Sequence, residues 1–239
     1  FSEISLSDRV RLKRLQEALG QAGEQFRKIE VKREKRPLIG VVGENFCRLN
    51  SFSNDEVVRQ IEKMGGEVWQ AGFAEWVLYS TAWERIELKA SGKGWSLRAL
   101  RSAILDGMLR KDENRLRLTL KSFLNGRPEP HRVVELLDLA RSYLPAEAGL
   151  GEMTLSLGRA VYLQRHGADG ILDISPFGCM NGLVCEAIYP RISADHGRIP
   201  VRSLYFDGIS RRREEELTLF LDLCQAYRRR AEKISRNTF

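Results

Sequence analysis

The sequence has few histidines and cysteines and no hydrophobic run of membrane-spanning length. It contains 3 His and 4 Cys in 239 residues. No apolar stretch approaches the roughly 20 residues that a transmembrane helix requires, and the charged N-terminus is unlike a secretory signal. We therefore expect a cytoplasmic protein without a membrane span, in which four cysteines are more typical of thiols or ligands than of disulfides.

Short motifs of common enzyme classes are also absent. There is no Gly-x-Ser-x-Gly elbow, Walker loop or zincin motif, and "VVGENF" is not a dinucleotide-binding fingerprint. His166 ends a predicted helix, where a cationic histidine is favoured for structural reasons, and His131 and His196 lie in or beside loops. The histidines therefore do not predict a general base.

The charge is basic but interspersed. Lys and Arg number 39 against 32 Asp and Glu, a net charge of +7, and the two signs alternate in segments such as "RRREEEL". Such alternation is typical of solvated helix faces, so nucleic-acid binding ranks below the two functions that the motifs indicate, which are given at the end of this section. The hydrophobic content of 43% supports a core without disulfides, and a chain that begins at Phe1 is expected to be a piece of a longer protein.

Hydrophobic patterning predicts an α/β fold. "LIGVVG", Leu38–Gly43, is typical of a strand covered on both faces in a parallel sheet. It is followed by the helical pattern "SNDEVVRQIEKMGG", in which Ser53 and Glu56 have capping-box spacing, and then by the strand pattern "EVWQAG". This order predicts a β-α-β unit.

The alternation is interrupted and then resumes. Residues 74 to about 145 are mostly helical in pattern, and "GILDIS" and "VRSLYF" then add two strands with intervening helices. We therefore predict a flavodoxin-like, open, mostly parallel, doubly wound sheet with a helical insertion at about 74–145. Residues 1–36 are predicted to be an N-terminal helix and linker, and residues 37–239 the α/β domain.

Ligands of such sheets bind beyond the carboxyl ends of the strands, where the strand order reverses. The predicted loops at these ends are "GENFCRLN", "SPFGCMNG" and "FDG". Their polar residues are the candidates for a site: Glu44, Asn45, Cys47, Arg48, Ser175, Cys179, Asn181 and Asp207. For Glu44 and Asn45 the structural alternative is capping of local backbone amides.

The four cysteines differ in their surroundings. Cys185 and Cys224 are in helical register with apolar neighbours, which predicts core packing. Cys179 follows Gly178 at the start of a helix, where a thiolate is stabilised, so it is either a ligand or nucleophile or a small residue packed under the turn. Cys47 could approach Cys179, but two thiolates do not complete a four-coordinate site.

Three segments together resemble the 2-hydroxyacyl-CoA dehydratase and benzoyl-CoA reductase subunit family, closest to its branch of activase-associated and double-cubane proteins. They are "RPLIGVVGENFCRLNSFSNDEVVRQIEKMGGEVWQAGFAEWVLY", "GADGILDISPFGCMNGLVCEAIYPRIS" and "IPVRSLYFDG". The resemblance runs from about Pro37 to the C-terminus. It implies two flavodoxin-like domains around a 4Fe-4S cluster held by three cysteines, nearby acyl-CoA, and an ATP-dependent activase that delivers a low-potential electron.

By this resemblance Cys179, in "PFGCM", matches the cluster ligand of the second domain, and the other ligands would come from a preceding domain. Glu44 is predicted to be a catalytic carboxylate. The residues predicted to bind substrate beside it, at the mouth of the sheet formed by the carboxyl ends of the strands, are Asn45, Arg48, Ser175 and Asn181. The expected function is that of a C-terminal domain of a 2-hydroxyacyl-CoA dehydratase, which is a lyase, or of a related reductase. The alternative is a non-catalytic domain that docks an activase or a sister subunit.

Overall fold

The computed structural model describes residues 8–31, 34–123, 127–148, 151–209 and 213–237. The chain divides into two compact units. The α/β unit comprises residues 35–79 and 130–239, and the helical unit comprises residues 1–34 and 80–129. Helix α4, Phe73–Ala90, begins in the α/β unit and ends in the helical unit.

The α/β unit contains a four-stranded parallel sheet. Its strands are β1 Leu38–Gly43, β2 Glu67–Gln70, β3 Gly170–Pro176 and β4 Val201–Phe206. They are ordered β2-β1-β3-β4, and every neighbouring pair is parallel. Because helices flank this sheet, the predicted flavodoxin-like α/β fold is confirmed.

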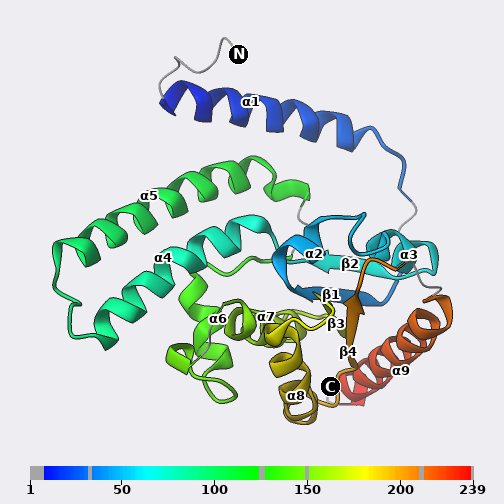
Figure 1. Ribbon diagram of the computed structural model, residues 1–239. Coiled ribbons are helices and arrows are strands. Elements are labelled where there is room, and N and C mark those ends of the chain that lie inside the picture. The colour runs from blue at the N-terminus through cyan, green and yellow to red at the C-terminus, as the bar shows by residue number, and fades with distance from the viewer. Residues whose placement is uncertain (1–7, 32–33, 124–126, 149–150, 210–212, 238–239) are drawn as a thin grey trace. The chain divides into compact units, whose positions relative to one another are not determined.

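Helices cover both faces of the sheet (Figure 1). One layer contains α7 Met153–Arg165 and α8 Met180–Asp195, with α6 Val133–Ala140 packed on α7; the other contains α3 Val57–Lys63 and α9 Glu214–Asn237. Strand β1 serves both cores, since Ile39 and Val41 face the α3 and α9 layer whereas Val42 faces the α7 and α8 layer. This two-sided burial explains why the β1 sequence is apolar throughout.

The predicted capping box is not formed. Helix α3 begins only at Val57, and Glu56 precedes it in a left-handed conformation with no side-chain cap. The Ser53 hydroxyl instead donates to the backbone oxygen of Asn50 at 2.9 Å. The short helix α2 spans Asn45–Leu49, and residues 51–56, which include Ser53, form the turns that follow it. Ser53 therefore lies four residues before the start of α3, too far to cap it.

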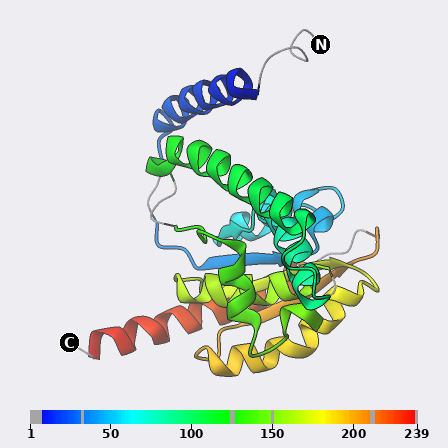
Figure 2. The same cartoon turned by 90° about the vertical axis from the view of Figure 1, so that its left-hand side faces the viewer.

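The helical unit joins segments that are distant in sequence. It contains α1 Asp8–Arg27, the second half of α4, α5 Leu97–Thr119 and the short helix η1 Lys121–Phe123. The C-terminal parts of α1 and α5 meet (Figure 2), and a Cβ built on Gly23 would lie 2.8 Å from the ring of Phe123. Glycine thus permits a close approach, which groups the N-terminal helix with residues 80–129.

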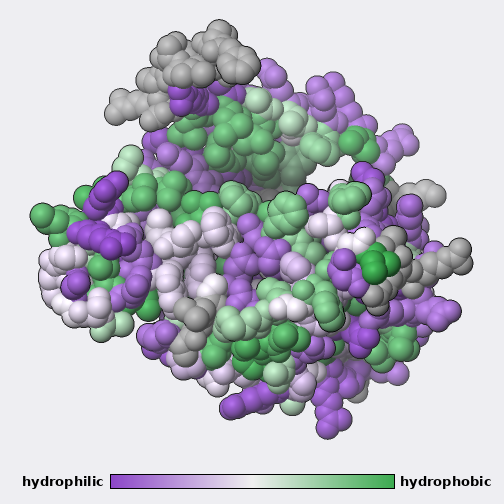
Figure 3. Space-filling model, viewed as in Figure 1, coloured by the Kyte–Doolittle hydropathy of each residue, from purple (hydrophilic) through white to green (hydrophobic). Residues whose placement is uncertain are grey.

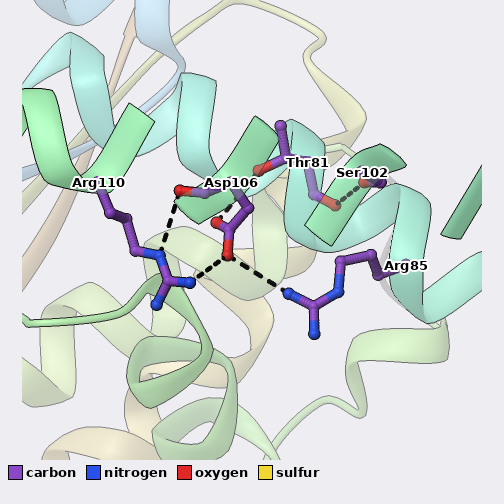
Figure 4. A network of polar contacts seen from close by, with 5 residues as sticks. All are labelled: Thr81, Arg85, Ser102, Asp106 and Arg110. Carbon is purple, nitrogen blue, oxygen red and sulfur yellow. Dashed lines mark hydrogen bonds and ion pairs between the residues drawn. The ribbon is translucent and has the colours of Figure 1, made fainter. Parts of the chain in front are cut away.

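A polar network ties α5 to the second half of α4 (Figure 4). The nearly buried Asp106 accepts ion pairs from Arg110 at 2.7 Å and Arg85 at 3.4 Å. The Ser102 hydroxyl donates to the backbone oxygen of Thr81 at 3.2 Å. This side of α5 is therefore occupied by α4. On the opposite side α1 approaches Thr119 near the C-terminal end of α5, whereas the segment from Leu97 to Met108 keeps its large apolar side chains exposed.

None of the helices in the described ranges is both long enough and apolar enough to cross a membrane. The longest, such as α5 and α9, carry charged residues throughout.

Candidate functional site

The strand order reverses between β1 and β3. The crossover from β1 leads to β2 on one side, and the crossover from β3 leads to β4 on the other. The carboxyl ends of β1 and β3 therefore form the crevice where open α/β sheets bind ligands. Helix α2 follows β1 directly, and the bend Phe177–Cys179 connects β3 to α8.

Glu44 closes the tip of β1. Its carboxylate accepts hydrogen bonds from the backbone amides of Phe46 at 2.9 Å and Cys47 at 2.6 Å, which caps α2. Its own backbone N–H donates to the oxygen of Ile174 on β3 at 2.9 Å. The carboxylate is thus engaged in the capping that was the structural alternative, and its catalytic role stays a prediction.

Asn45 and Arg48 connect three elements behind this tip. The guanidinium of Arg48 is buried and donates to the backbone oxygen of Ala71 at 2.6 Å and to Oδ1 of Asn45 at 3.0 Å. The backbone N–H of Asn45 donates to Glu152 at 3.0 Å. Burial lowers the pKa of Arg48, and Glu75 and Glu152 partly oppose this effect. Arg48 therefore acts as an internal brace.

A small recess beside Arg48 contains charges that the sequence patterns did not reveal. Its charged lining consists of Arg48, Arg159, Glu75 and Glu152. Arg159 is 1% exposed and pairs with Glu75 at 3.0 Å. Burial raises the pKa of Glu152. Since two guanidiniums face two carboxyl groups, the recess has little net attraction for either an anion or a cation.

Ser175 is sealed beneath α8. It is 1% exposed, and its hydroxyl donates to Asp173 at 3.2 Å. A Cβ built on Gly182 of α8 would lie 2.8 Å from the Ser175 oxygen, so the helix passes directly over the hydroxyl. This burial argues against direct contact of Ser175 with a ligand at the mouth, because α8 would have to move. Its substrate-binding role stays a prediction.

Asp173 is the most deeply buried carboxylate at the crevice. Tyr189 donates to it at 2.5 Å, and Gly43 of the neighbouring strand allows close approach, since a Cβ there would lie 2.9 Å from Asp173 Oδ1. Burial raises the pKa of Asp173 to about 6, although the hydrogen bonds from Tyr189 and Ser175 lower it. No sequence motif marked Asp173, because it lies inside an otherwise apolar strand.

Cys179 differs from the other three cysteines in its exposure. It is half-buried, whereas Cys47, Cys185 and Cys224 are at most 1% exposed. It is the N-cap residue of α8, and its backbone N–H donates to the oxygen of Pro176 at 3.1 Å. Gly178, with φ of +77°, makes the preceding bend. The thiol at the helix start is therefore accessible at the carboxyl edge of the sheet.

The buried thiols pack as the sequence predicted for two of them. Cys185 lies in the core under α7 and α8, and Cys224 lies in the core under α3 and α9. Cys47 also lies in the second core, where burial and then Glu44 raise its pKa to about 12. Cys179 contributes to the same shift, so the two thiols share one neighbourhood, but Cys47 is unsuited to act as a thiolate.

The remaining candidates lie at the rim. Asn181 is half-buried on the first turn of α8, and a Cβ built on Gly151 would lie 2.6 Å from its amide nitrogen. Asp207 is exposed after β4 and accepts a hydrogen bond from the backbone of Ile209 at 3.1 Å. Asn181 therefore stands beside the start of α7, and Asp207 shapes its own loop.

Large apolar side chains are exposed on the segments that carry the mouth. On α2 and the turn after it they are Phe46, Leu49 and Phe52; on the bend and the start of α8 they are Phe177, Met180 and Leu183. Phe52 is 92% exposed and Phe177 is 77% exposed. Sequence analysis missed this group, because its members are scattered among polar loop residues. Such a concentration around a crevice is typical of a surface that another molecule covers.

Within the described ranges, no cluster of three or more His, Cys, Asp or Glu side chains is arranged to hold a metal ion. Comparisons with protein-family models, with curated proteins and with solved structures find no match for this chain. A proposed function therefore depends on the geometry of the site and on the family resemblance of the three sequence segments described above.

Proposed function

We propose that this chain is the second α/β domain of a 2-hydroxyacyl-CoA dehydratase-like iron–sulfur protein, in which Cys179 supplies one ligand of a 4Fe-4S cluster. The observation that carries the proposal is the exposure of Cys179: it is the accessible cysteine of the four, and it stands at the mouth of the sheet at the start of α8. Helix N-termini favour thiolates, which are the ligands of such clusters.

The thiol of Cys179 can supply only one of the ligands that a 4Fe-4S cluster needs. Because no described cluster of three potential ligands surrounds it, the remaining ligands must come from another domain or subunit. The exposed apolar side chains of Phe46, Phe177 and Met180 provide a surface on which that domain could pack. A cluster held in this way would supply one-electron transfer at low potential.

The protein residues have distinct proposed tasks. Asn45 and Asn181 are half-buried at the mouth and could position an acyl-CoA thioester, whereas Arg48 and Ser175 are buried and support the backbone beneath. Glu44 holds α2 in place through its two amide contacts. The activase or sister subunit would approach the same edge to deliver the electron.

The test is anaerobic purification of the protein from the cells that produce it, together with any subunit that copurifies, followed by reconstitution with iron and sulfide. We expect a brown protein with absorption at about 400 nm, and Cys179→Ser should lose most of the iron. Cys185→Ala is the matched control, because it removes a core thiol. Circular dichroism must show that both variants fold.

Full iron content in Cys179→Ser would overturn the proposal. A colourless, well-folded preparation would favour the alternative, a non-catalytic docking domain.

A further inference from the structure

The helical unit carries the whole net charge of the protein. It contains 19 Lys and Arg against 12 Asp and Glu, whereas the α/β unit contains 20 of each. The excess of +7 is therefore not spread over the surface. Such a concentration of one sign attracts partners of the opposite sign and guides their approach.

The side of α5 that faces away from α4 is a narrow apolar stripe. Leu97, Leu100, Ile104 and Met108 follow one another at helical spacing and are 86%, 59%, 56% and 61% exposed. Trp95, just before the helix, is fully exposed. Hydrophobic side chains reach the surface over α1 and α5 in Figure 3 as well. We call Leu97, Leu100, Ile104 and Met108 the α5 seam.

The α5 seam has the spacing of a coiled-coil helix. If Leu97 is placed at position a, then Leu100 is at d and Ile104 at the next a, with Gly107 at the following d. Every one of these positions is exposed. Met108 takes the next e position, and the polar Lys111 and Asn114 take the a and d positions that follow. The seam is thus one narrow row of four apolar side chains, narrower than the broad apolar face with which a helix lies on a membrane, so it favours another helix as the occupant.

The positions that flank the seam select the charge of that helix. Apart from Met108, which belongs to the seam, the e and g positions between Leu97 and Leu118 hold Arg101, Arg115, Ala103, Arg110 and Arg117, and none holds a carboxylate. Such positions decide which helices pair. A second copy of α5 would oppose arginine to arginine, which is unfavourable, whereas a helix with glutamates there would be complementary.

We propose that the α5 seam binds an acidic amphipathic helix of a partner protein. Leu97, Leu100 and Ile104 would pack between its apolar residues, and Gly107 would allow close approach of the two backbones. Arg101 and Arg115 would pair with its carboxylates. The network of Asp106 with Arg85 and Arg110 holds the opposite side of α5 and presents the seam as a preformed surface. This inference does not depend on the iron–sulfur proposal.

The test uses the full chain and two labelled helical peptides, roughly four heptads long, with leucine at a and d. One peptide has glutamate at e and g, and the other has lysine. Fluorescence anisotropy should show that the glutamate peptide binds at least about tenfold more tightly, and that added salt weakens its binding. The double substitution Leu100→Glu and Ile104→Glu should abolish binding, whereas Leu219→Glu, at an exposed position of α9, should not change it.

Charge reversal gives the sharper measurement. Arg101→Glu combined with Arg115→Glu should exchange the preference, so that the lysine peptide binds more tightly. Equal affinity for both peptides, or an unchanged preference after reversal, would overturn the proposal.

Two other outcomes would also overturn it. If the chain ignored both peptides but co-sedimented with vesicles of phosphatidylcholine and phosphatidylserine through the seam, the surface would bind lipid. If the glutamate substitutions in the seam lowered the unfolding temperature by more than Leu219→Glu does, the seam would be covered within the intact protein.

Discussion

The two units of this protein differ in their net charge and in how deeply their charged groups are buried. The α/β unit is electrically neutral and buries several of its charged groups in pairs or hydrogen-bonded clusters, including Arg48, Arg159 and Asp173. Among its described charged groups the helical unit buries only Asp106, and it has a net charge of +7 and leaves a row of apolar side chains exposed. Buried, balanced charges hold a crevice in one shape, whereas exposed, unbalanced charges are suited to recognition of another molecule.

The largest effect should come from breaking the buried ion pair in the α/β unit. Arg159→Met leaves the nearly buried Glu75 without its guanidinium, which should lower the free energy of unfolding by about 3–5 kcal/mol in urea denaturation. Lys13→Met in the helical unit removes an exposed pair with Glu17 and should cost less than about 0.5 kcal/mol. Equal effects of the two substitutions would remove the contrast between the units.

The buried carboxylate of Asp173 should make stability depend on pH. Because its pKa is raised from 3.8 to about 6 in the folded protein, the native state keeps a proton that the unfolded state releases. The free energy of unfolding should therefore fall, by up to about 3 kcal/mol, as pH rises from about 4 to about 7.

Urea denaturation at several pH values checks this dependence, and Asp173→Asn should flatten it. Since burial also raises the pKa of Glu152 and of Asp169, a weaker slope of the same sign should remain in the variant. Identical slopes for the two proteins would show that Asp173 does not carry the effect.

The same glycine-to-alanine change should have opposite signs in the two units. A Cβ at position 158 would lie 1.9 Å from the backbone oxygen of Leu136, so Gly158→Ala should force α6 and α7 apart and cost about 1–3 kcal/mol. Gly107→Ala meets no atom within 4 Å and should stabilise α5 by about 0.5–1 kcal/mol. Thermal unfolding of both variants provides the comparison, and a stabilising Gly158→Ala would show that the two helices can separate at little cost.

A modest loss should come from breaking the network in the helical unit. Asp106→Asn removes the charge that pairs with Arg110 and Arg85, but both arginines remain partly exposed and can be hydrated. We expect a loss of about 1 kcal/mol in thermal unfolding. Asp112→Asn, at a half-exposed position of the same helix, is the control and should have almost no effect. A loss as large as that of Arg159→Met would mean that the charge of Asp106 contributes as much to stability as the buried ion pair of the α/β unit.

Much of the fold could be read from local patterns. The apolar run Leu38–Gly43 and the segments "GILDIS" and "VRSLYF" predicted three strands close to their observed bounds, because burial on one or both faces is written directly into hydrophobicity. The capping box at Ser53 was wrong, because the same residues also suit the turn after α2. The sequence did not predict that α1 forms one compact unit with residues 80–129, because this grouping depends on contacts between helices that are far apart in sequence.

The candidate site was predicted less completely. Cys179 was distinguished from Cys185 and Cys224 by its place after a glycine bend, and the structure places it at the edge and the other two in the cores. Ser175 lies near the carboxyl end of β3 and Arg48 lies in α2 directly after β1, where polar side chains of a site are expected, yet both are buried. Asp173, Glu75 and Arg159 were missed, because a charge inside an apolar segment acquires meaning only through its partners.

The sequence by itself determined the strands, most helices and the inward packing of two cysteines, because each follows from the period of apolar residues along a few turns or one strand. Tertiary structure alone decided which charges are buried together, which thiol remains accessible, and that the entire positive excess belongs to one unit. Those properties depend on distances between residues far apart in the chain, and electrostatic energy and burial are functions of such distances.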